Sequence, residues 1–110
     1  MPDLASIGVS ASQWVGREER AEDEVTGQAA RRLAATLDMP AGGFAHGAQL
    51  PEGWHVILSP PLAPTSGLGR DGHPQTGDFL PALPLPRRMF ASRRVIFHQP
   101  LLIGDAVTRV

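Results

Sequence analysis

Several features that would point to particular classes of protein are missing from this 110-residue sequence. It contains no cysteine, which excludes disulfide bonds, a thiolate nucleophile and cysteine-ligated zinc within these residues. Its formal net charge is -1, so it lacks the basic field that attracts nucleic acid. No apolar run approaches the roughly 20 residues of a membrane-spanning helix, and the N-terminus lacks a secretory signal pattern. We therefore expect a cytoplasmic protein that binds neither nucleic acid nor membranes.

The composition is that of a small folded domain. Hydrophobic residues make up 42% of the chain, which is enough apolar material for a core. The length predicts a single domain over residues 1–110. Most of the 11 prolines lie between Pro60 and Pro86, in a stretch without helical or strand periodicity. We expect a long proline-rich loop at about 59–87, either mobile or covering a ligand or partner surface.

One helix is predicted by a regular apolar pattern in "VTGQAARRLAATLD". Apolar residues recur every four positions, with two alanines beside them, while Arg31 and Arg32 fall on the opposite face. The pattern predicts a central, buried helix from Thr26 to Asp38, capped by Thr26 or Asp23. Met39-Pro40 and the following glycines end it. The buried stripe comprises Val25, Ala29, Leu33 and Leu37, flanked by Ala30 and Ala34.

The other elements are expected to be short strands. "GWHVILS" at 53–59 and "RRVIFHQP" at 93–100 both alternate, and "AVTRV" at 106–110 begins to alternate after a Gly-Asp turn. The charged run "REERAEDE" at 17–24 is expected to be a solvated helical turn or a linker. One helix followed by antiparallel strands predicts an α+β fold in which the helix packs across one sheet.

No catalytic constellation or cofactor motif is evident. The four histidines, 46, 55, 73 and 98, do not pair at a metal-ligand spacing. There is no Gly-x-Ser-x-Gly nucleophile motif, and "GLGRDG" lies in a loop rather than opening a helix. We therefore predict no catalytic residue, no metal ion and no cofactor for this chain.

Two features could bind a ligand. "DGHP" is typical of a turn, and it could also hold Asp71 and His73 at the edge of a cleft. "PRRM" places Arg87 and Arg88 at the end of the long loop, either as a surface pair or as an anion site. With "SRR" close by, these arginines would suit a coenzyme A phosphate or an acidic partner. We predict all four named residues as substrate-binding.

Several motifs occur together in an order that is typical of one family. They are "WVGREER", "ARRLAATLD", "LPEGWH", "LGRDGHP", "LPALPLPRRM" and "PLLIGD". On these motifs the chain resembles the N-terminal half of the mesaconyl-coenzyme A hydratase group. That group belongs to the MaoC-like, double hot-dog acyl-thioester hydratases, which include the mitochondrial 3-hydroxyacyl-thioester dehydratases. The chain departs from the family at 90–93, where "FASR" replaces a tryptophan followed by small residues.

The resemblance implies a hot-dog-like antiparallel sheet wrapped on one central helix, here incomplete. In that family the catalytic Asp and His lie in the C-terminal half, and no position of this chain matches their motif. The expected function is a non-catalytic or partner-dependent N-terminal module of an enoyl-thioester hydratase or 3-hydroxyacyl-thioester dehydratase system, in fatty acid metabolism. The alternatives are a small acyl-thioester- or protein-binding module without enzymatic activity, or a truncated product.

The implied ligands and partners follow from the same resemblance. The ligand would be an acyl-CoA or an acyl-carrier-protein thioester. The sequence stops on the opening residues of a strand, so we expect it to correspond to a piece of a longer module. An open sheet edge near 94–99 and 106–110 would then pair with a second copy, giving a homodimer, or with a complementary hydratase subunit.

Overall fold

The computed structural model describes residues 4–75, 79–81 and 89–110, and these form parts of two compact units. One unit comprises residues 20–60 and 94–110, and we call it the sheet unit. The other comprises residues 1–19 and 61–93, and we call it the loop unit. The described part contains α-helices and an antiparallel strand pair, so the fold class is α+β, as predicted. No helix among the described residues is long and apolar enough to cross a membrane.

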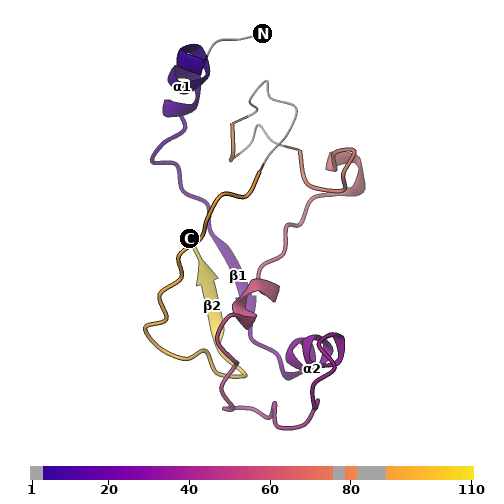
Figure 1. Cartoon of the computed structure of the whole chain (residues 1–110). Helices are drawn as coiled ribbons and strands as arrows, with labels where there is room; N and C mark the ends of the chain where they lie inside the picture. The colour runs from indigo at the N-terminus through magenta and orange to yellow at the C-terminus, as the bar shows by residue number, and fades with distance from the viewer. Residues whose placement is uncertain (1–3, 76–78, 82–88) are drawn as a thin grey trace. The chain divides into compact units, whose positions relative to one another are not determined.

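The sheet unit contains two short antiparallel strands, β1 (Ala21–Glu24) and β2 (Ala106–Arg109) (Figure 1). Their register places Ala21 opposite Arg109 and Glu24 opposite Ala106. The strand predicted at 106–110 is therefore confirmed. The prediction for the charged run at 17–24 was wrong in its second half, because those residues form β1. Pairing with a segment from the other end of the chain makes this polar stretch a strand.

The predicted helix is confirmed as α2, Gly27–Thr36. Thr26 is its N-cap, and the Thr26 hydroxyl accepts a hydrogen bond from the Ala29 N–H at 3.1 Å. At the other end Asp38 adopts a left-handed φ of 56°. The Met39 N–H donates to the Ala34 carbonyl and the Asp38 N–H to the Ala35 carbonyl, at 2.8 and 3.2 Å. These two bonds are those of a Schellman motif, and they satisfy carbonyls that the helix end leaves unpaired.

The core of the sheet unit lies between α2, the strands and the segments around residues 50 and 103. Ala30 and Ala34 are the most deeply buried helix residues, at 0% exposure, whereas Leu37 is 50% exposed and Leu33 is half-buried. Of the predicted stripe, Val25 is buried, Ala29 and Leu33 are half-buried and Leu37 is exposed, so the helix itself is buried through the flanking alanines. Small side chains let α2 approach its neighbours closely. The buried cluster is Val25, Ala30, Leu50 and Ile103, and Phe44, Ala48, Trp54, Leu58, Leu101 and Val107 pack against it.

The strand predicted at 53–59 was wrong. Trp54–Ile57 form a short 3-10 helix, preceded by Gly53 with a φ of 89°. The Pro51 carbonyl accepts from the Trp54 N–H at 3.1 Å, and the His55 carbonyl accepts from the Leu58 N–H at 3.0 Å. These local bonds replace a strand ladder. An alternation of only five residues does not separate the two structures, because either can place Trp54 against the core.

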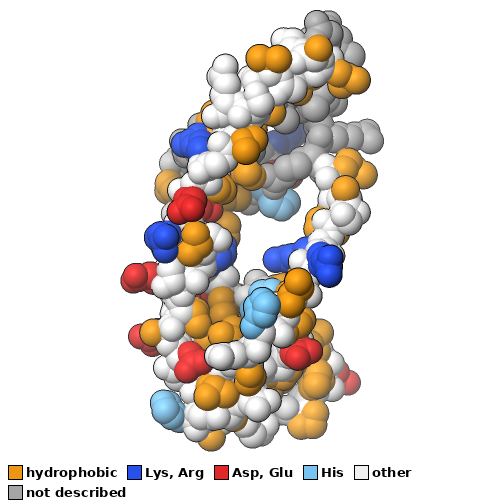
Figure 2. Space-filling model, turned by 90° about the vertical axis from the view of Figure 1, so that its left-hand side faces the viewer, with side chains coloured by type: hydrophobic (Ala, Val, Ile, Leu, Met, Phe, Trp, Pro, Cys, Tyr) orange, Lys and Arg blue, Asp and Glu red, His pale blue; other side chains and the backbone are white. Residues whose placement is uncertain are grey.

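The strand predicted at 93–100 was also wrong, since residues 89–100 have neither helical nor strand structure. Val95, Ile96 and Phe97 are 43%, 61% and 45% exposed, so the alternation does not separate a buried face from an exposed one. Apolar side chains lie at the surface among charged ones in the space-filling view (Figure 2). The strand β2 pairs with β1 instead of with this segment.

Charged side chains from both strands form hydrogen bonds with the backbone of Ser59. This residue lies near the end of the stretch 20–60 of the sheet unit. The Asp23 carboxylate accepts from the Ser59 N–H at 2.7 Å, and the Arg109 guanidinium donates to the Ser59 carbonyl at 2.9 Å. Ser59 adopts a left-handed φ of 50°. Its hydroxyl is buried, and it has no hydrogen-bond partner among the described residues. Both backbone groups of Ser59 are therefore fixed by ionic groups from β1 and β2.

The loop unit contains α1, Leu4–Ser12, and a 3-10 turn at Thr65–Gly67. No residue of α1 is buried. The proline-rich loop predicted at about 59–87 is irregular where it is described, apart from that turn and a small hairpin after it. Residues 76–78 and 82–88 lie outside the described part of the chain.

Candidate functional site

The hairpin at residues 67–75 carries the first predicted binding motif. Leu68 and Pro74 form an antiparallel bridge. The Gly69 N–H donates to the His73 carbonyl at 2.6 Å, and the Gln75 N–H donates to the Gly67 carbonyl at 2.9 Å. Gly72 takes a φ of 83°, a conformation that is easily reached only by glycine. The turn predicted for "DGHP" is therefore confirmed.

Within this turn the Asp71 carboxylate contacts both the backbone and the imidazole of His73. The Asp71 Oδ1 accepts from the His73 backbone N–H at 3.0 Å, and Oδ2 lies 3.1 Å from the imidazole Nδ1. Both side chains are well exposed, 64% for His73 and 72% for Asp71. The sequence predicted these two residues as a binding pair. The structure brings them into direct contact at the protein surface.

The electrostatics of the pair are set by the backbone of the turn. The His73 N–H, more than any other group, holds the pKa of the Asp71 carboxyl below its ordinary value of 3.8. Hydrogen bonding and charge interaction with the His73 imidazole act in the same direction, while partial desolvation opposes them. Asp71 is therefore an anion at neutral pH and acts only as a hydrogen-bond acceptor.

The second predicted binding motif is only partly described. Arg87 and Arg88 lie outside the described residues, so their role as an anion site stays a prediction. Arg93 and Arg94, which the sequence joined to the same basic patch, are both exposed. They fall on opposite sides of the boundary between the loop unit and the sheet unit.

Two histidines of the sheet unit, His55 and His46, make packing contacts. The His55 ring meets the Phe97 ring edge-on, with centroids 5.8 Å apart. His46 lies over Gly104, where a β-carbon would come within 2.5 Å of the imidazole. Among residues 4–75, 79–81 and 89–110 no group of three or more His, Asp or Glu could hold a metal ion.

The sheet unit has an open pocket that was not predicted from the sequence. It is about 590 Å³ in volume and lies where two segments separate after running side by side. The Leu50 N–H donates to the Leu101 carbonyl at 2.8 Å, and Gln49 and Leu102 form a bridge. Pro51 and Pro100 follow at the divergence and, having no N–H, cannot extend this ladder. The proline at the end of each segment was the feature of the sequence that could have indicated this divergence. The lining residues are Gln49, Leu50, Pro51, Glu52, Phe97, His98, Gln99 and Pro100.

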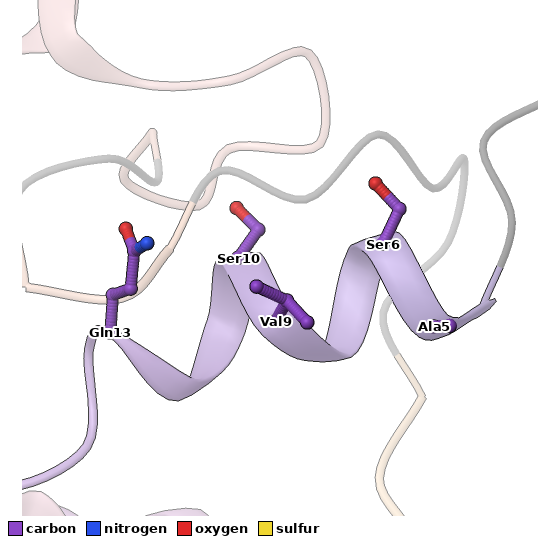
Figure 3. Close-up of a pocket in the computed structure, with 5 residues that line it drawn as sticks. All are labelled: Ala5, Ser6, Val9, Ser10 and Gln13. Atoms are coloured by element: carbon purple, nitrogen blue, oxygen red, sulfur yellow. The ribbon is translucent and has the colours of Figure 1, made fainter.

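A second hollow lies along α1 in the loop unit (Figure 3). Ser6, Ser10 and Gln13 project from the same side of the helix, with Val9 beside them. All of these side chains are exposed, and they lie along one side of α1 and the residue that follows it. The hollow offers a few hydroxyl and amide groups without an enclosing wall.

Comparison with known proteins decides the family. A model described as hydroxyacyl-thioester dehydratase type 2 matches residues 53–110. The chain belongs to this family. The mesaconyl-C(4)-CoA hydratase of Chloroflexus aurantiacus is 47% identical over 96 residues, which cover 87% of this chain and 34% of that protein. The resemblance to MaoC-like hydratases and dehydratases that the sequence motifs indicated is confirmed.

The family match includes every residue that was predicted to bind substrate. Asp71, His73, Arg87 and Arg88 all fall within residues 53–110, as does one wall of the sheet-unit pocket at residues 97–100. The helix α2 and strand β1 precede the family match, but the alignment with the Chloroflexus hydratase covers most of the chain. This chain spans about a third of the length of that relative.

Proposed function

We propose that this chain is the N-terminal, acyl-thioester-binding module of an enoyl-thioester hydratase or 3-hydroxyacyl-thioester dehydratase system. It holds the thioester, and the residues that carry out the chemistry belong to another segment or subunit. The observation that carries this proposal is the dehydratase family match over residues 53–110, joined to 47% identity with a mesaconyl-CoA hydratase. The ligand is an acyl-CoA or an acyl-carrier-protein thioester.

The described site supports a binding role more than a catalytic one. Hydration of a conjugated thioester needs a base for water, an acid for the α-carbon and donors for the thioester oxygen. The described residues offer one exposed carboxylate–imidazole pair, Asp71 with His73, outside any enclosed pocket. An exposed pair in water lacks the dry, preorganised surroundings that give such groups their catalytic effect. Asp71 and His73, with Arg87 and Arg88, are therefore proposed as ligand contacts.

The fold that goes with this function is an incomplete hot dog. In this proposal α2 is the central helix, and β1 and β2 belong to a sheet that further strands complete. The two-stranded ribbon supports the idea, since so small a sheet is rarely stable without more strands or extensive packing. A second copy of the chain or a complementary hydratase subunit supplies those strands, and both compact units belong to one module.

The test is reconstitution. The 110-residue chain is assayed for loss of the enoyl-thioester absorbance with crotonyl-CoA and mesaconyl-CoA. It is assayed alone and after mixing with a polypeptide that carries the part of the Chloroflexus hydratase not matched here. We expect thioester binding without turnover for the chain alone, and turnover in the mixture.

Three results would change or contradict the proposal. Steady turnover by the pure chain would make it an enzyme in its own right, and loss of that turnover in His73→Ala would place the chemistry at the hairpin. Thioester binding without turnover in every mixture would instead favour the alternative of a small binding module. Absence of thioester binding would contradict both.

A further inference from the structure

The Asp71–His73 pair fixes the position of one proton. Oδ1 of Asp71 accepts from the His73 N–H at 3.0 Å, and Oδ2 faces Nδ1 of the imidazole at 3.1 Å. An ionised carboxylate has lone pairs and no proton to give. The imidazole nitrogen that faces it must therefore be the donor. In neutral His73 the single ring proton lies on Nδ1.

The other ring nitrogen is consequently a bare acceptor. A neutral imidazole carries one N–H, so Nε2 of His73 keeps its lone pair. The side chain is 64% exposed, and within the described residues Nε2 has no hydrogen-bond partner. A group with this polarity selects hydrogen-bond donors, and it offers nothing to a carbonyl or a phosphate oxygen.

The hairpin holds this acceptor in a defined place. The bridge between Leu68 and Pro74 closes the hairpin, and the Gly72 N–H donates to the Gly69 carbonyl at 3.0 Å. Asp71 uses one oxygen for the backbone of His73 and the other for its ring. The ring orientation is thus tied to the turn. Less conformational freedom remains to be lost when a ligand binds than for an unsupported surface histidine.

We propose that Nε2 of His73 accepts a hydrogen bond from the hydroxyl group of a 3-hydroxyacyl thioester, with Asp71 as the residue that positions the imidazole. This inference rests on the proposed function, and it names the part of the ligand that the hairpin recognises. The hydrated ligand carries a hydroxyl donor, whereas the enoyl ligand has none at that carbon. The module therefore distinguishes the two sides of the reaction, and it prefers the hydroxyacyl form.

One substitution should convert Nε2 of His73 from a hydrogen-bond acceptor to a donor while preserving the turn. In Asp71→Asn the amide oxygen still accepts from the His73 N–H, so the cap of the turn is preserved. The amide nitrogen now faces Nδ1, and it donates where the carboxylate accepted. The ring proton moves to Nε2, which becomes a donor. Asp71→Asn should thus remove the preference for the hydroxyacyl ligand without unfolding the hairpin.

The experiment has two readouts on the whole 110-residue chain. Nitrogen-15 NMR of the imidazoles, at a pH where they are neutral, reports which nitrogen is protonated. Isothermal titration then gives the affinities for 3-hydroxybutyryl-CoA and crotonyl-CoA. For the wild type we expect the Nδ1–H form of His73, and about three- to tenfold tighter binding of the hydroxyacyl ligand, the range for one hydrogen bond. His46→Gln, which alters an exposed histidine of the sheet unit outside its pocket, is the matched control and should keep the preference.

Each outcome bears on a different part of the proposal. An Nε2–H form of His73 in the wild type overturns the inference. So does equal affinity for the two thioesters, or a preference that survives Asp71→Asn. In both of these cases thioester binding persists, and the proposed function stands. If neither thioester binds, the proposed function fails, and recognition of the hydroxyl fails with it, whatever the tautomer.

Discussion

The sheet unit and the loop unit are stabilised in different ways. All the buried hydrophobic residues of the described chain belong to the sheet unit, namely Val25, Ala30, Ala34, Leu50 and Ile103. The sheet unit is also joined by backbone bonds between distant segments, such as Val25 N–H to Asp105 and Leu50 N–H to Leu101. The described part of the loop unit has no buried residue. The backbone bonds of the described part of the loop unit join residues close in sequence, as in Gly69 with His73.

From this difference we infer that the sheet unit provides most of the stability and the loop unit provides recognition. Burial of apolar side chains is the main favourable contribution to folding, and it is concentrated in the sheet unit. Turns and short hairpins position exposed polar groups at little cost to the core, and they are where binding residues usually lie. The loop unit carries the exposed Asp71–His73 pair on such a hairpin. Substitutions should accordingly act on unfolding in one unit and on binding in the other.

The largest expected effect is the loss of a core side chain from the sheet unit. Ile103 is buried in the cluster with Val25 and Leu50, so Ile103→Ala should lower the free energy of unfolding by about 2–5 kcal/mol. Leu62→Ala in the loop unit, at a residue 95% exposed, should change it by less than about 0.5 kcal/mol. Urea denaturation followed by tryptophan fluorescence measures both. Equal changes in the free energy of unfolding for the two variants would contradict the proposed difference between the units.

A smaller loss is expected at a glycine that the sheet unit requires. Gly104 has a φ of 103°, and a β-carbon there would meet the His46 ring at 2.5 Å. Gly104→Ala should cost about 1–3 kcal/mol through backbone strain, with the displacement of His46 in addition. Gly42→Ala is the matched control, because its β-carbon would meet no atom within 4 Å and its φ is not positive. Thermal denaturation of the two variants, measured side by side, should separate them clearly.

Acid should weaken the sheet unit through the carboxylate of Asp23. The Ser59 N–H first, and then the Glu24 N–H, hold the pKa of the Asp23 carboxyl below its ordinary value of 3.8. A folded-state pKa that is lowered contributes stability that is present above 3.8 and lost as pH falls through the folded value. Asp23→Asn should therefore reduce the loss of stability in that acid range.

Asp71 is the control for this titration, because its pKa is lowered as well, chiefly by the His73 N–H. Its partners lie in the exposed hairpin, outside the buried cluster. Asp71→Asn should leave the acid dependence of global unfolding nearly unchanged. Urea midpoints between neutral pH and pH 2 would test this, and a larger effect from Asp71→Asn than from Asp23→Asn would contradict the comparison.

The smallest expected effect is a gain at Ser59. Its hydroxyl is buried without a partner in the described chain, and its φ of 50° is strained for serine. Ser59→Gly relieves both, but it also adds freedom to the unfolded chain, so we expect a net gain of about 0.5 kcal/mol. Ser59→Ala removes only the hydroxyl, and comparing the two variants in urea separates strain from desolvation. A loss of stability in both would mean that the hydroxyl has a partner.

Elements with local signals were predicted well from the sequence. The helix α2 was predicted because the residues that determine it are all local. Its N-cap, its apolar spacing and the residues that end it lie between Thr26 and Met39. The turn at Asp71 to Pro74 was found for the same reason, since Gly and Pro fix its backbone. The family was also found, because its motifs occur in order along the chain and a family model matches residues 53–110.

Elements that depend on partners far away in the sequence were not predicted well. The strand β1 is acidic and shows no apolar alternation, and it is a strand because β2 pairs with it and Ser59 binds its Asp23 side chain. Conversely, the alternation at 93–100 predicted a strand for which the described chain supplies no partner. In the candidate site, Asp71 and His73 were chosen from the sequence, but the contact between their carboxylate and imidazole could be found only in the structure. The pocket between 49–52 and 97–100 required them too, because its walls are far apart in sequence.

The sheet unit is assembled from two stretches of chain, and this has a consequence for the order of folding. Residues 61–93 separate those stretches, so β1 finds its partner only after β2 is available. Synthesis proceeds from the N-terminus, and α2, Val25 and Leu50 therefore emerge well before Ile103. Until then their apolar faces have nothing to cover them. Bringing the two stretches together closes a long loop before any long-range contact forms, and that search should set the refolding rate of the sheet unit.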